Sequence, residues 1–567
     1  MRTIWLIATI WMLGCSGADN DPVDAGEDLD TDLGTDLSQV DSGADLGSDA
    51  GTDLGLDLMT DTGTDMGTDL QVDAGFDLGF DLGFDTTTDL ETDLQEDAGF
   101  DVDVQVCTNC QLPEPLWAVS VGGAFADLAL AVATSPDGSV TLGGHTGSPK
   151  LHVDGIYQAT TGVESKRKVF VTHQSAEGDP VWTRIFGGPG DDRLRAVASD
   201  STGHILIGGL TIQSPLFAFG DTVFQPNAKM DGYFARLTPG GQVVFANLFG
   251  EEKDEVVLAV AADYDNNVLV GGYFSSPSVN LGSGPVQNTQ DIEQYDLLVA
   301  KTGPEGEVYW TRAWGGYGFD YIHSIAADLD GNIYITGGTS VYGLTIGNQV
   351  LQSHGDRDIW VAKLSPTGEP QWAHIFGGEN HDASHALAVS PAGDVYVTGS
   401  LQSEMVNFGG SNIYHVGSKE HHDIFLIKLD TNGNHVWSQG FGGPDWDLAK
   451  SVTLGPDETV FITGAFNSPT LSLGGDPLTG PGPGGRKVEA LAAAFSPDGQ
   501  HLWSYAFGGP DDDMGYWVSA NAGGALSIGG TFNGTSDGEP PPEGTMDAGT
   551  GPLAVTGGRD SFAVRLY

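Results

Sequence analysis

A unit of about 65 residues recurs along most of the chain, and this periodicity limits the fold more than any other feature. Its clearest copy runs from Asp358 to Ser400. There, hydrophobic alternation and Gly/Pro/Asp turn signals predict four short strands, DIWVAKL, QWAHIF, SHALAVS and DVYVTGS. The second of these strands carries an aromatic residue near its start in seven copies, 62 to 66 residues apart: Trp117, Trp182, Phe245, Trp310, Trp372, Trp437 and Trp503. Such regular spacing indicates seven repeats of one structural unit.

Each aromatic strand is followed by a glycine turn and then by an acidic residue at a fixed offset. These acids are Asp127, Asp192, Glu255, Asp320, Asp382, Asp447 and Asp513. Four residues further on, six of the seven copies have Ala or Ser, and the last has Trp517. Small residues there predict a close approach of neighbouring sheets.

Four strands in each of seven repeats predict an all-β fold, a seven-bladed β-propeller with four-stranded blades over residues 116–567. The module begins on the strand of Trp117 and lacks the strand that precedes it in the other copies. That strand stands at the far end, as DSFAVRL from Asp560 to Leu566. We therefore expect the first and last segments to pair in one blade and close the ring, which removes two sheet edges.

The first residues predict export. Arg2 and the apolar run from Ile4 to Leu13 form a signal too short to span a bilayer, so residues 1–14 are interpreted as a signal peptide. The sequence MLGCSG resembles a bacterial lipobox, with Met12 where the pattern prefers Leu. The resemblance implies lipidation of Cys15 and, because Ser16 is not Asp, an outer-membrane or cell-surface lipoprotein. The alternative is a signal that is cut elsewhere, with Cys15 discarded.

The segment that follows the lipobox is strongly acidic, with 27 Asp or Glu and no Lys or Arg between residues 17 and 106. Like charges four residues apart and frequent glycine oppose a helix, so residues 15–106 are predicted to be a disordered tether that carries the lipidated cysteine. Regularly spaced carboxylates also suggest a loose association with Ca²⁺. Closely spaced ligand loops of the D-x-D-x-D-G type are absent from this stretch.

Two cysteines, Cys107 and Cys110, lie in a linker of residues 107–115 before the first blade. In an exported protein, neighbouring cysteines usually form a disulfide. Haem attachment would need His where Gln111 stands, and a structural zinc site would need two further ligands nearby.

The lengths of the loops distinguish the two faces of the predicted propeller. One face carries short turns such as SPDG, DSTG and DLDG. The other carries the glycine-acid turns and seven long connections, several with glycine patterns that suggest small hairpins. Long connections on a compact scaffold are usually functional, so this face is the candidate surface for an unknown protein or glycan ligand.

Two groups of side chains on that face are candidates for cation binding. The seven recurrent acids could surround one end of a channel, but their recurrence with the glycines in every repeat favours a role in accepting hydrogen bonds from their own glycine turns. His381, His421 and His422 could hold zinc or copper, or could be ordinary loop residues. His323 and His385, in the innermost strands, either line the channel or pack between blades.

Several functions find no support in the sequence. It contains no H-E-x-x-H or P-loop motif. With 21 basic and 51 acidic residues after residue 106, the propeller carries a net charge of about −30, which repels nucleic acid.

The recurring pattern W-x-x-x-F-G-G-x-x-x-D followed by G-x-V-Y-V-T-G resembles the SBBP-type β-propeller repeat of secreted and lipid-anchored bacterial proteins. The resemblance implies a surface location and supplies no substrate. TGEPQW is also similar to the tryptophan-docking turn of quinoproteins, which generally have eight blades and adjacent cysteines. We expect a monomeric, lipid-anchored binding module on an acidic tether. The alternatives are a propeller-type enzyme acting on extracellular polysaccharide and a structural component of the envelope.

Overall fold

The computed structural model describes residues 115–153, 156–159, 166–289, 294–340, 342–480, 487–509, 512–533, 546–547, 552–553 and 559–566. Within these ranges the chain forms strands and turns and no helix. The predicted signal peptide, Cys15, the acidic tether with its suggested Ca²⁺ association, Cys107 and Cys110 lie outside the described residues.

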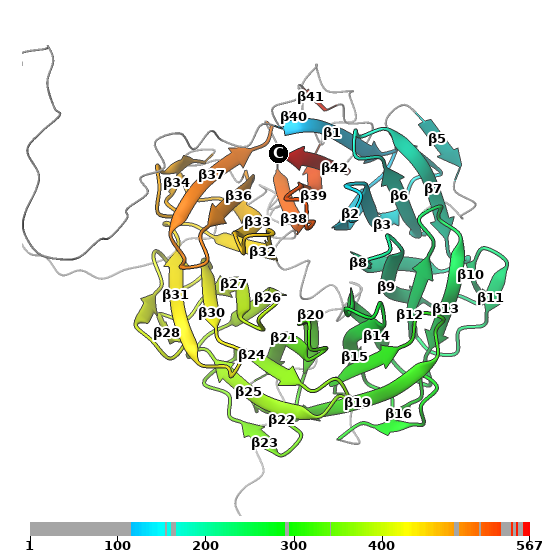
Figure 1. Ribbon diagram of the computed structural model, residues 1–567, viewed down its shortest axis with the longest axis horizontal. Helices are drawn as coiled ribbons and strands as arrows, with labels where there is room; N and C mark the ends of the chain where they lie inside the picture. The colour runs from blue at the N-terminus through cyan, green and yellow to red at the C-terminus, as the bar shows by residue number, and fades with distance from the viewer. Residues whose placement is uncertain are drawn as a thin grey trace, which may run out of the picture. The chain divides into compact units, whose positions relative to one another are not determined.

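The strands form seven sheets arranged as the blades of a propeller around a common centre (Figure 1). Each blade runs outward in the order inner, second, third and outer strand. The inner strands are β2 (Asp127–Thr134), β8 (Asp191–Ser199), β14 (Glu255–Ala262), β20 (Tyr321–Ala327), β26 (Asp382–Val389), β32 (Asp447–Leu454) and β38 (Asp513–Ala520). The second strands are β3 (Val140–Thr146), β9 (Ile205–Ile212), β15 (Val268–Phe274), β21 (Ile333–Ser340), β27 (Val395–Leu401), β33 (Val460–Phe466) and β39 (Leu526–Asn533).

The outer half of each blade consists of its third and outer strands, which a short turn connects in every blade except the one that contains both ends of the described chain. The third strands are β6 (Lys168–Gln174), β12 (Met230–Leu237), β18 (Asp296–Thr302), β24 (Arg357–Leu364), β30 (Asp423–Leu429), β36 (Glu489–Phe495) and β42 (Arg559–Leu566). The outer strands are β7 (Pro180–Phe186), β13 (Val243–Phe249), β19 (Val308–Gly316), β25 (Pro370–Phe376), β31 (His435–Phe441), β37 (His501–Phe507) and β1 (Pro115–Gly122). The strand with the recurrent acid is therefore innermost and the tryptophan strand outermost, as expected.

One blade combines the two ends of the described chain. In this sheet β42 lies between β39 and β1, and Trp117 is the partner of Arg565 in the β1–β42 pairing. The backbone N–H of Ala129 in β2 donates to Ser561 Oγ at 2.5 Å, and that hydroxyl donates to the carbonyl of Asp127 at 2.7 Å. The last blade is thereby hydrogen-bonded to the first. Pro115 belongs to β1, so the propeller begins one residue earlier than the sequence predicted.

The hydrophobic core lies between adjacent blades. Ala131 and Ala196, two of the small residues at the expected position, are buried against the next sheet. The sheets approach so closely that a Cβ on Gly143 would lie 2.4 Å from Val197. The exception at this position, Trp517, is half-buried and packs against the first blade.

Tryptophans of five outer strands donate hydrogen bonds to a turn of the following blade. The indole N–H of Trp182 donates to the carbonyl of Pro239 at 2.8 Å, and that of Trp372 donates to the carbonyl of Thr431 at 3.1 Å. The indole N–H of Trp117 donates to the carbonyl of Ala176, across the junction of the last and first blades. The turn that receives each ring needs glycine; at Gly241, with φ of 74°, a Cβ would lie 2.8 Å from the indole of Trp182.

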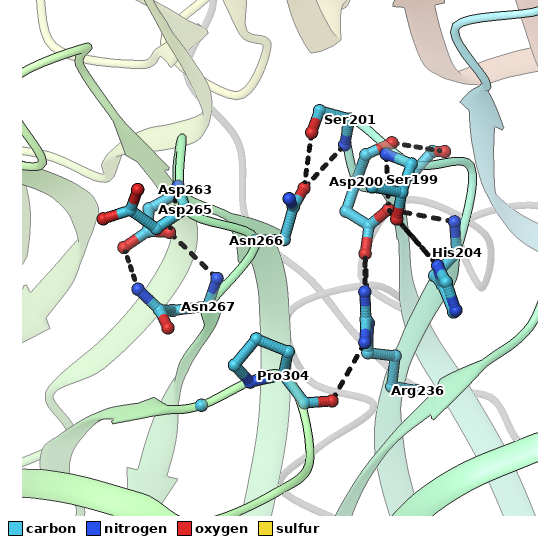
Figure 2. Close-up of polar contacts among 12 residues, drawn as sticks. Ser199, Asp200, Ser201, His204, Arg236, Asp263, Asp265, Asn266, Asn267 and Pro304 are labelled. Atoms are coloured by element: carbon cyan, nitrogen blue, oxygen red, sulfur yellow. Dashed lines mark hydrogen bonds and ion pairs between the residues drawn. The ribbon is translucent and has the colours of Figure 1, made fainter.

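The short-turn face is occupied by contacts that hold the turns and blades together (Figure 2). Arg236 forms two hydrogen bonds with the buried carboxylate of Asp200 and a third with the carbonyl of Pro304 in the next blade. Asn266 accepts hydrogen bonds from the backbone and the hydroxyl of Ser201. Polar side chains on this face therefore have structural partners.

The seven long connections form small hairpins at the periphery of the ring (Figure 1). Their strands are β4 (Lys150–Val153) and β5 (Ile156–Ala159), β10 (Phe217–Phe219) and β11 (Thr222–Phe224), β16 (Ser278–Val279) and β17 (Val286–Gln287), β22 (Leu344–Ile346) and β23 (Gln349–Leu351), β28 (Met405–Asn407) and β29 (Asn412–Tyr414), β34 (Thr470–Leu471) and β35 (Leu478–Thr479), and β40 (Met546–Asp547) and β41 (Pro552–Leu553). Two hairpins extend the outer strand of the preceding blade, where β4 pairs with β1 and β22 pairs with β19. This pairing covers edges that would otherwise be exposed.

Candidate functional site

The recurrent acids are buried at the start of the inner strands. Six of them accept a hydrogen bond from a backbone N–H four residues earlier, in their own turn; for example, Gly316 donates to Asp320 and Gly378 donates to Asp382, both at 2.8 Å. Asp127 accepts instead from the hydroxyl of Ser148 at 2.8 Å. These carboxylates hold the glycine turns in place, which is the structural role that the sequence favoured over cation binding.

A second acid stands at the start of the third strand in six blades, buried at Asp231, Asp296, Asp358, Asp423 and Asp560 and half-buried at Glu489. Asp231 accepts hydrogen bonds from the backbone of Asn227 and Ala228, and Asp296 from that of Thr289. These acids therefore fix the ends of long connections.

Acids of the two kinds meet at the interfaces between blades, where burial and like charge raise their pKa values. Burial, opposed by hydrogen bonds and reinforced by Asp296, raises the pKa of Asp320 to about 7. Burial raises the pKa of Glu255 to about 7, with Asp231 contributing, and that of Asp447 to about 7, with Asp423 contributing. One carboxyl group at each of these three interfaces therefore keeps its proton up to a pH near neutral.

The first blade breaks this pattern. In place of the second acid it has Lys168, whose ammonium lies 3.3 Å from the carboxylate of Asp192, with both side chains buried. The ammonium also donates to the carbonyls of Arg167 and Gly190. One interface is therefore held by an ion pair.

The structure does not bring the three candidate histidines to one point. The rings of His381 and His422 lie 5.8 Å apart between centroids. His421 instead places Nε2 3.8 Å from a carboxylate oxygen of Asp445, and its carbonyl is 3.0 Å from Nε2 of His415. Among the described residues, no group of three His, Cys, Asp or Glu side chains is placed to hold a metal ion.

An aromatic patch lies on the long-connection face at the fourth blade, and we define it by Tyr317, Phe319 and Tyr342. These side chains are 53%, 43% and 69% exposed. The rings of Tyr317 and Tyr342 lie 6.2 Å apart, edge to face. Phe319 rests on Tyr295 at 5.0 Å, and Tyr295 stacks on Tyr273 at 4.5 Å. Two exposed rings thus stand beside a third that is supported by a buried aromatic stack.

Hydrogen bonds fix the turn that carries the patch. The hydroxyl of Ser340 accepts from the backbone of Phe319 at 3.1 Å and donates to the carbonyl of Tyr317 at 3.3 Å. Arg357 is the partner of Ser340 in the pairing of β21 with β24, which places a cation at the same end of the sheet. Rings held in this way lose little conformational freedom when a ligand binds.

The sequence carried a signal for this patch that the repeat analysis missed. The turn GGYGFD has two aromatic residues, whereas GGAFAD and GGPDWD have one each and the other four glycine-acid turns have none. Comparing the repeats for their differences would have found it.

A comparison with protein families matches residues 310–345 to the model described as SBBP, beta-propeller repeat. The chain carries SBBP-type β-propeller repeats. The matched residues include the whole aromatic patch.

Two curated proteins match part of the chain. The chain is 21% identical over 347 residues to an uncharacterized WD repeat-containing protein, L264, of Acanthamoeba polyphaga mimivirus, covering 49% of the chain and 25% of that protein. It is 26% identical over 355 residues to the regulatory protein FlaEY of Caulobacter vibrioides, covering 58% of the chain and 35% of that protein. The aligned residues span between a quarter and about a third of these relatives.

Solved structures also show partial likeness. The match to Sqt1 of Chaetomium thermophilum covers 74% of this chain and 82% of the Sqt1 chain, with 12% identity and a TM-score of 0.36. XC5397, a gluconolactonase of Xanthomonas campestris, matches 64% of the chain and 94% of its own, with 11% identity and a TM-score of 0.29. Within the described residues there is no helix long and apolar enough to cross a bilayer.

Proposed function

We propose that the protein is an exported, lipid-anchored binding module whose propeller holds a glycan at the aromatic patch. The observation that carries the proposal is the pair of exposed rings Tyr317 and Tyr342. Tyr317 and Phe319 lie in a turn that hydrogen bonds to Ser340 hold, and Tyr342 follows the strand that ends at Ser340. Aromatic rings present a flat apolar face and, in tyrosine, a polar hydroxyl, which suits the mixed C–H and O–H surface of a sugar.

The arrangement of the two faces supports this location. The short-turn face uses its polar groups to join blades, as Arg236 and Asn266 do (Figure 2). On the long-connection face the hairpins lie at the periphery, so they do not cover the ends of the inner strands (Figure 1).

We expect Tyr317→Ala and Tyr342→Ala each to weaken glycan binding by about 5- to 10-fold, because each removes a stacking surface of about 1 kcal/mol. The double variant should lose binding altogether on a glycan array. The measurement is an array screen of the purified protein, followed by calorimetry with the best glycan.

Tyr264→Ala is the matched control. Tyr264 is 71% exposed but lies in a turn of the short-turn face, between β14 and β15, so its removal should leave binding unchanged. Equal loss with this variant, or full binding by the double variant, contradicts the proposed site. Release of a shortened glycan would show an enzyme instead.

The proposed lipid anchor depends on Cys15, and it is tested separately from glycan binding. In a bacterial host that processes lipoproteins, Cys15→Ser should move the protein from the detergent phase to the aqueous phase of a Triton X-114 extraction, because the acyl chains supply the membrane affinity. Cys107→Ser is the control and should partition like the natural protein. A Cys15→Ser variant that stays in the detergent phase overturns the lipid anchor.

A further inference from the structure

Arg357 stands beside the aromatic patch, at the long-connection end of the fourth blade. It begins β24, and its partner across the sheet is Ser340, the last residue of β21 (Figure 1). Residues directly opposite each other in an antiparallel pair place their side chains on the same face of the sheet. The side chain of Arg357 therefore shares a face with the Ser340 hydroxyl, which holds the turn of Tyr317 and Phe319.

The hydroxyl of Tyr321 holds this guanidinium in place. Tyr321 is opposite Gly338 in the pairing of β20 with β21, two residues before Ser340 and thus on the same face. Its ring crosses the glycine, where a Cβ would lie 2.8 Å from the hydroxyl oxygen. Burial raises the pKa of Tyr321, while the charge of Arg357 and its hydrogen bond to the hydroxyl oppose the rise. Arg357 is half-buried, so its position is restrained while solvent still reaches it.

Arg357 forms no ion pair with any carboxylate among the described residues. The adjacent Asp358 points to the opposite face, as alternation along a strand requires, and accepts hydrogen bonds from the hydroxyl of Ser353 and the backbone of His354. Cations at the other end of the third strands do have carboxylate partners: Arg236 with Asp200 at 2.6 Å, Lys301 with Asp263 at 2.8 Å and Lys428 with Asp394 at 3.0 Å. In a strongly acidic chain, this guanidinium is thus left for a carboxylate from outside.

The acids next to this position in sequence leave room for a small anionic ligand. Asp320 lies on the other face of β20, where it accepts from the backbone of Gly316, and burial raises its pKa to about 7. Asp356 is exposed, so water and salt screen its charge. Charges further away than about 8 Å are largely screened at physiological ionic strength. A ligand with one or a few negative charges can therefore approach, whereas the net charge of the propeller repels a long polyanion.

Resting on the glycan binding proposed above, we infer that the aromatic patch takes a glycan with an acidic sugar of the uronic acid class and that Arg357 binds its carboxylate. A guanidinium presents parallel N–H donors that match the two oxygens of a carboxylate, and such charge-assisted bonds are stronger than those between neutral groups. The rings of Tyr317 and Tyr342 take the apolar face of the sugar. Arg357 thus determines which sugars bind, and the rings supply the contact surface.

The test compares matched ligands on the natural chain, so it does not depend on a variant that folds. Trimers of glucuronic, galacturonic and mannuronic acid are titrated calorimetrically into the full chain beside their carboxyl-reduced counterparts, which keep each sugar ring and lose the charge. We expect at least one acidic trimer to bind about 10-fold or more tightly than its neutral counterpart, because a hydrogen bond to a charged group contributes more than one to a neutral group. A 6-sulfated galactose trimer that binds as tightly as the galacturonate trimer would overturn the assignment of a carboxylate.

Variants then assign the preference to one residue. Arg357→Gln should weaken binding of the preferred acidic trimer about 10-fold and leave its neutral counterpart within about 2-fold, whereas Arg357→Lys keeps part of the preference. Arg312→Gln is the control, because Arg312 pairs with Glu369 on the short-turn face, and it should bind like the natural chain. Equal binding of acidic and neutral trimers that is lost with Tyr317→Ala overturns this inference and leaves the glycan site in place. Binding of no trimer and no array glycan overturns both proposals.

Discussion

Deletion of residues 559–567 abolishes the cooperative unfolding transition, or lowers its midpoint by more than about 10 °C, if β42 has the role that its contacts indicate. This strand is the third of its blade and is hydrogen-bonded on both sides, to β39 and to β1. Phe562 and Ala563 are fully buried. Without it, β1 loses the partner that connects it to this blade, and β39 becomes an exposed edge open to aggregation.

The effect should exceed that of a local defect because β42 also joins the last blade to the first. Besides the contacts of Ser561, Arg565 donates to the carbonyl of Gly138 at 2.7 Å. Replacing only Ser561 by Ala should cost about 1 to 3 kcal/mol, since it leaves one buried N–H without an acceptor. A synthetic peptide of residues 559–567 should restore part of the transition when added to the truncated chain.

Scanning calorimetry and circular dichroism measure the outcome. Arg559→Ala is the control, because Arg559 lies at the start of the strand and its side chain contacts only the neighbouring Asn533 in the described contacts. It should unfold within about 2 °C of the natural chain. A truncated protein that unfolds like the control would show that the ring does not need its terminal strand.

Most of the architecture was predictable because the same pattern of strands and turns recurs in every repeat. The strands predicted in the copy from Asp358 to Ser400 match β24 to β27, since alternation and turn residues agree in that unit. The pairing of Asp560–Leu566 with the strand of Trp117 followed from a missing element at one end and an extra one at the other. Repetition makes such an inference possible without any contact information.

The site was less predictable, because it depends on distances between blades. Nothing in the sequence near Asp320 shows that Asp296, from the preceding blade, would face it, or that Lys168 would take the equivalent place beside Asp192. The histidines illustrate the reverse error. His421 and His422 are adjacent in sequence, yet one approaches Asp445 and the other lies beside His381. Adjacent residues on an irregular connection have no fixed common direction.

The paired carboxyl groups lead to a second prediction with a large expected effect. We expect the free energy of unfolding of the propeller to be greater at pH 5 than at pH 8. For Asp320 the folded pKa is raised to about 7, above the unfolded value near 3.9. A group with a raised pKa contributes stability that is fully present below its unfolded pKa and is lost as the pH rises through its folded pKa. Each such group should cost about 2 to 3 kcal/mol between pH 5 and pH 8.

Several groups act in the same direction. Burial raises the pKa of Asp127 to about 6, and that of Glu255, Asp423 and Asp447 to about 7. Chemical denaturation at several pH values should therefore show the unfolding free energy falling most steeply between about pH 5 and pH 6 and levelling off near pH 8. A flat profile over this interval would mean that the pairs are ionised or hydrated in the folded protein.

Asp320→Asn isolates one pair, because the amide has nearly the same shape and cannot ionise. At pH 5 the variant should be at most about 1 kcal/mol less stable than the natural chain, since the protonated carboxyl and the amide each present one acceptor oxygen and one donor to the N–H of Gly316 and the hydroxyl of Thr339. By pH 8 this difference should move by about 2 to 3 kcal/mol in favour of the variant and change sign, because only the natural chain then has to ionise or distort a buried carboxyl group.

Asp265→Asn is the control for this pair, because Asp265 is exposed in a turn on the opposite face. It should keep the pH dependence of the natural chain. If Asp320→Asn also keeps it, the pH dependence arises elsewhere. If the slope falls as expected, the buried carboxyl pairs couple pH to the turns of the long-connection face, since the N–H that Asp320 accepts belongs to the turn that carries Tyr317 and Phe319. Ligand binding at the aromatic patch would then weaken over the same pH interval.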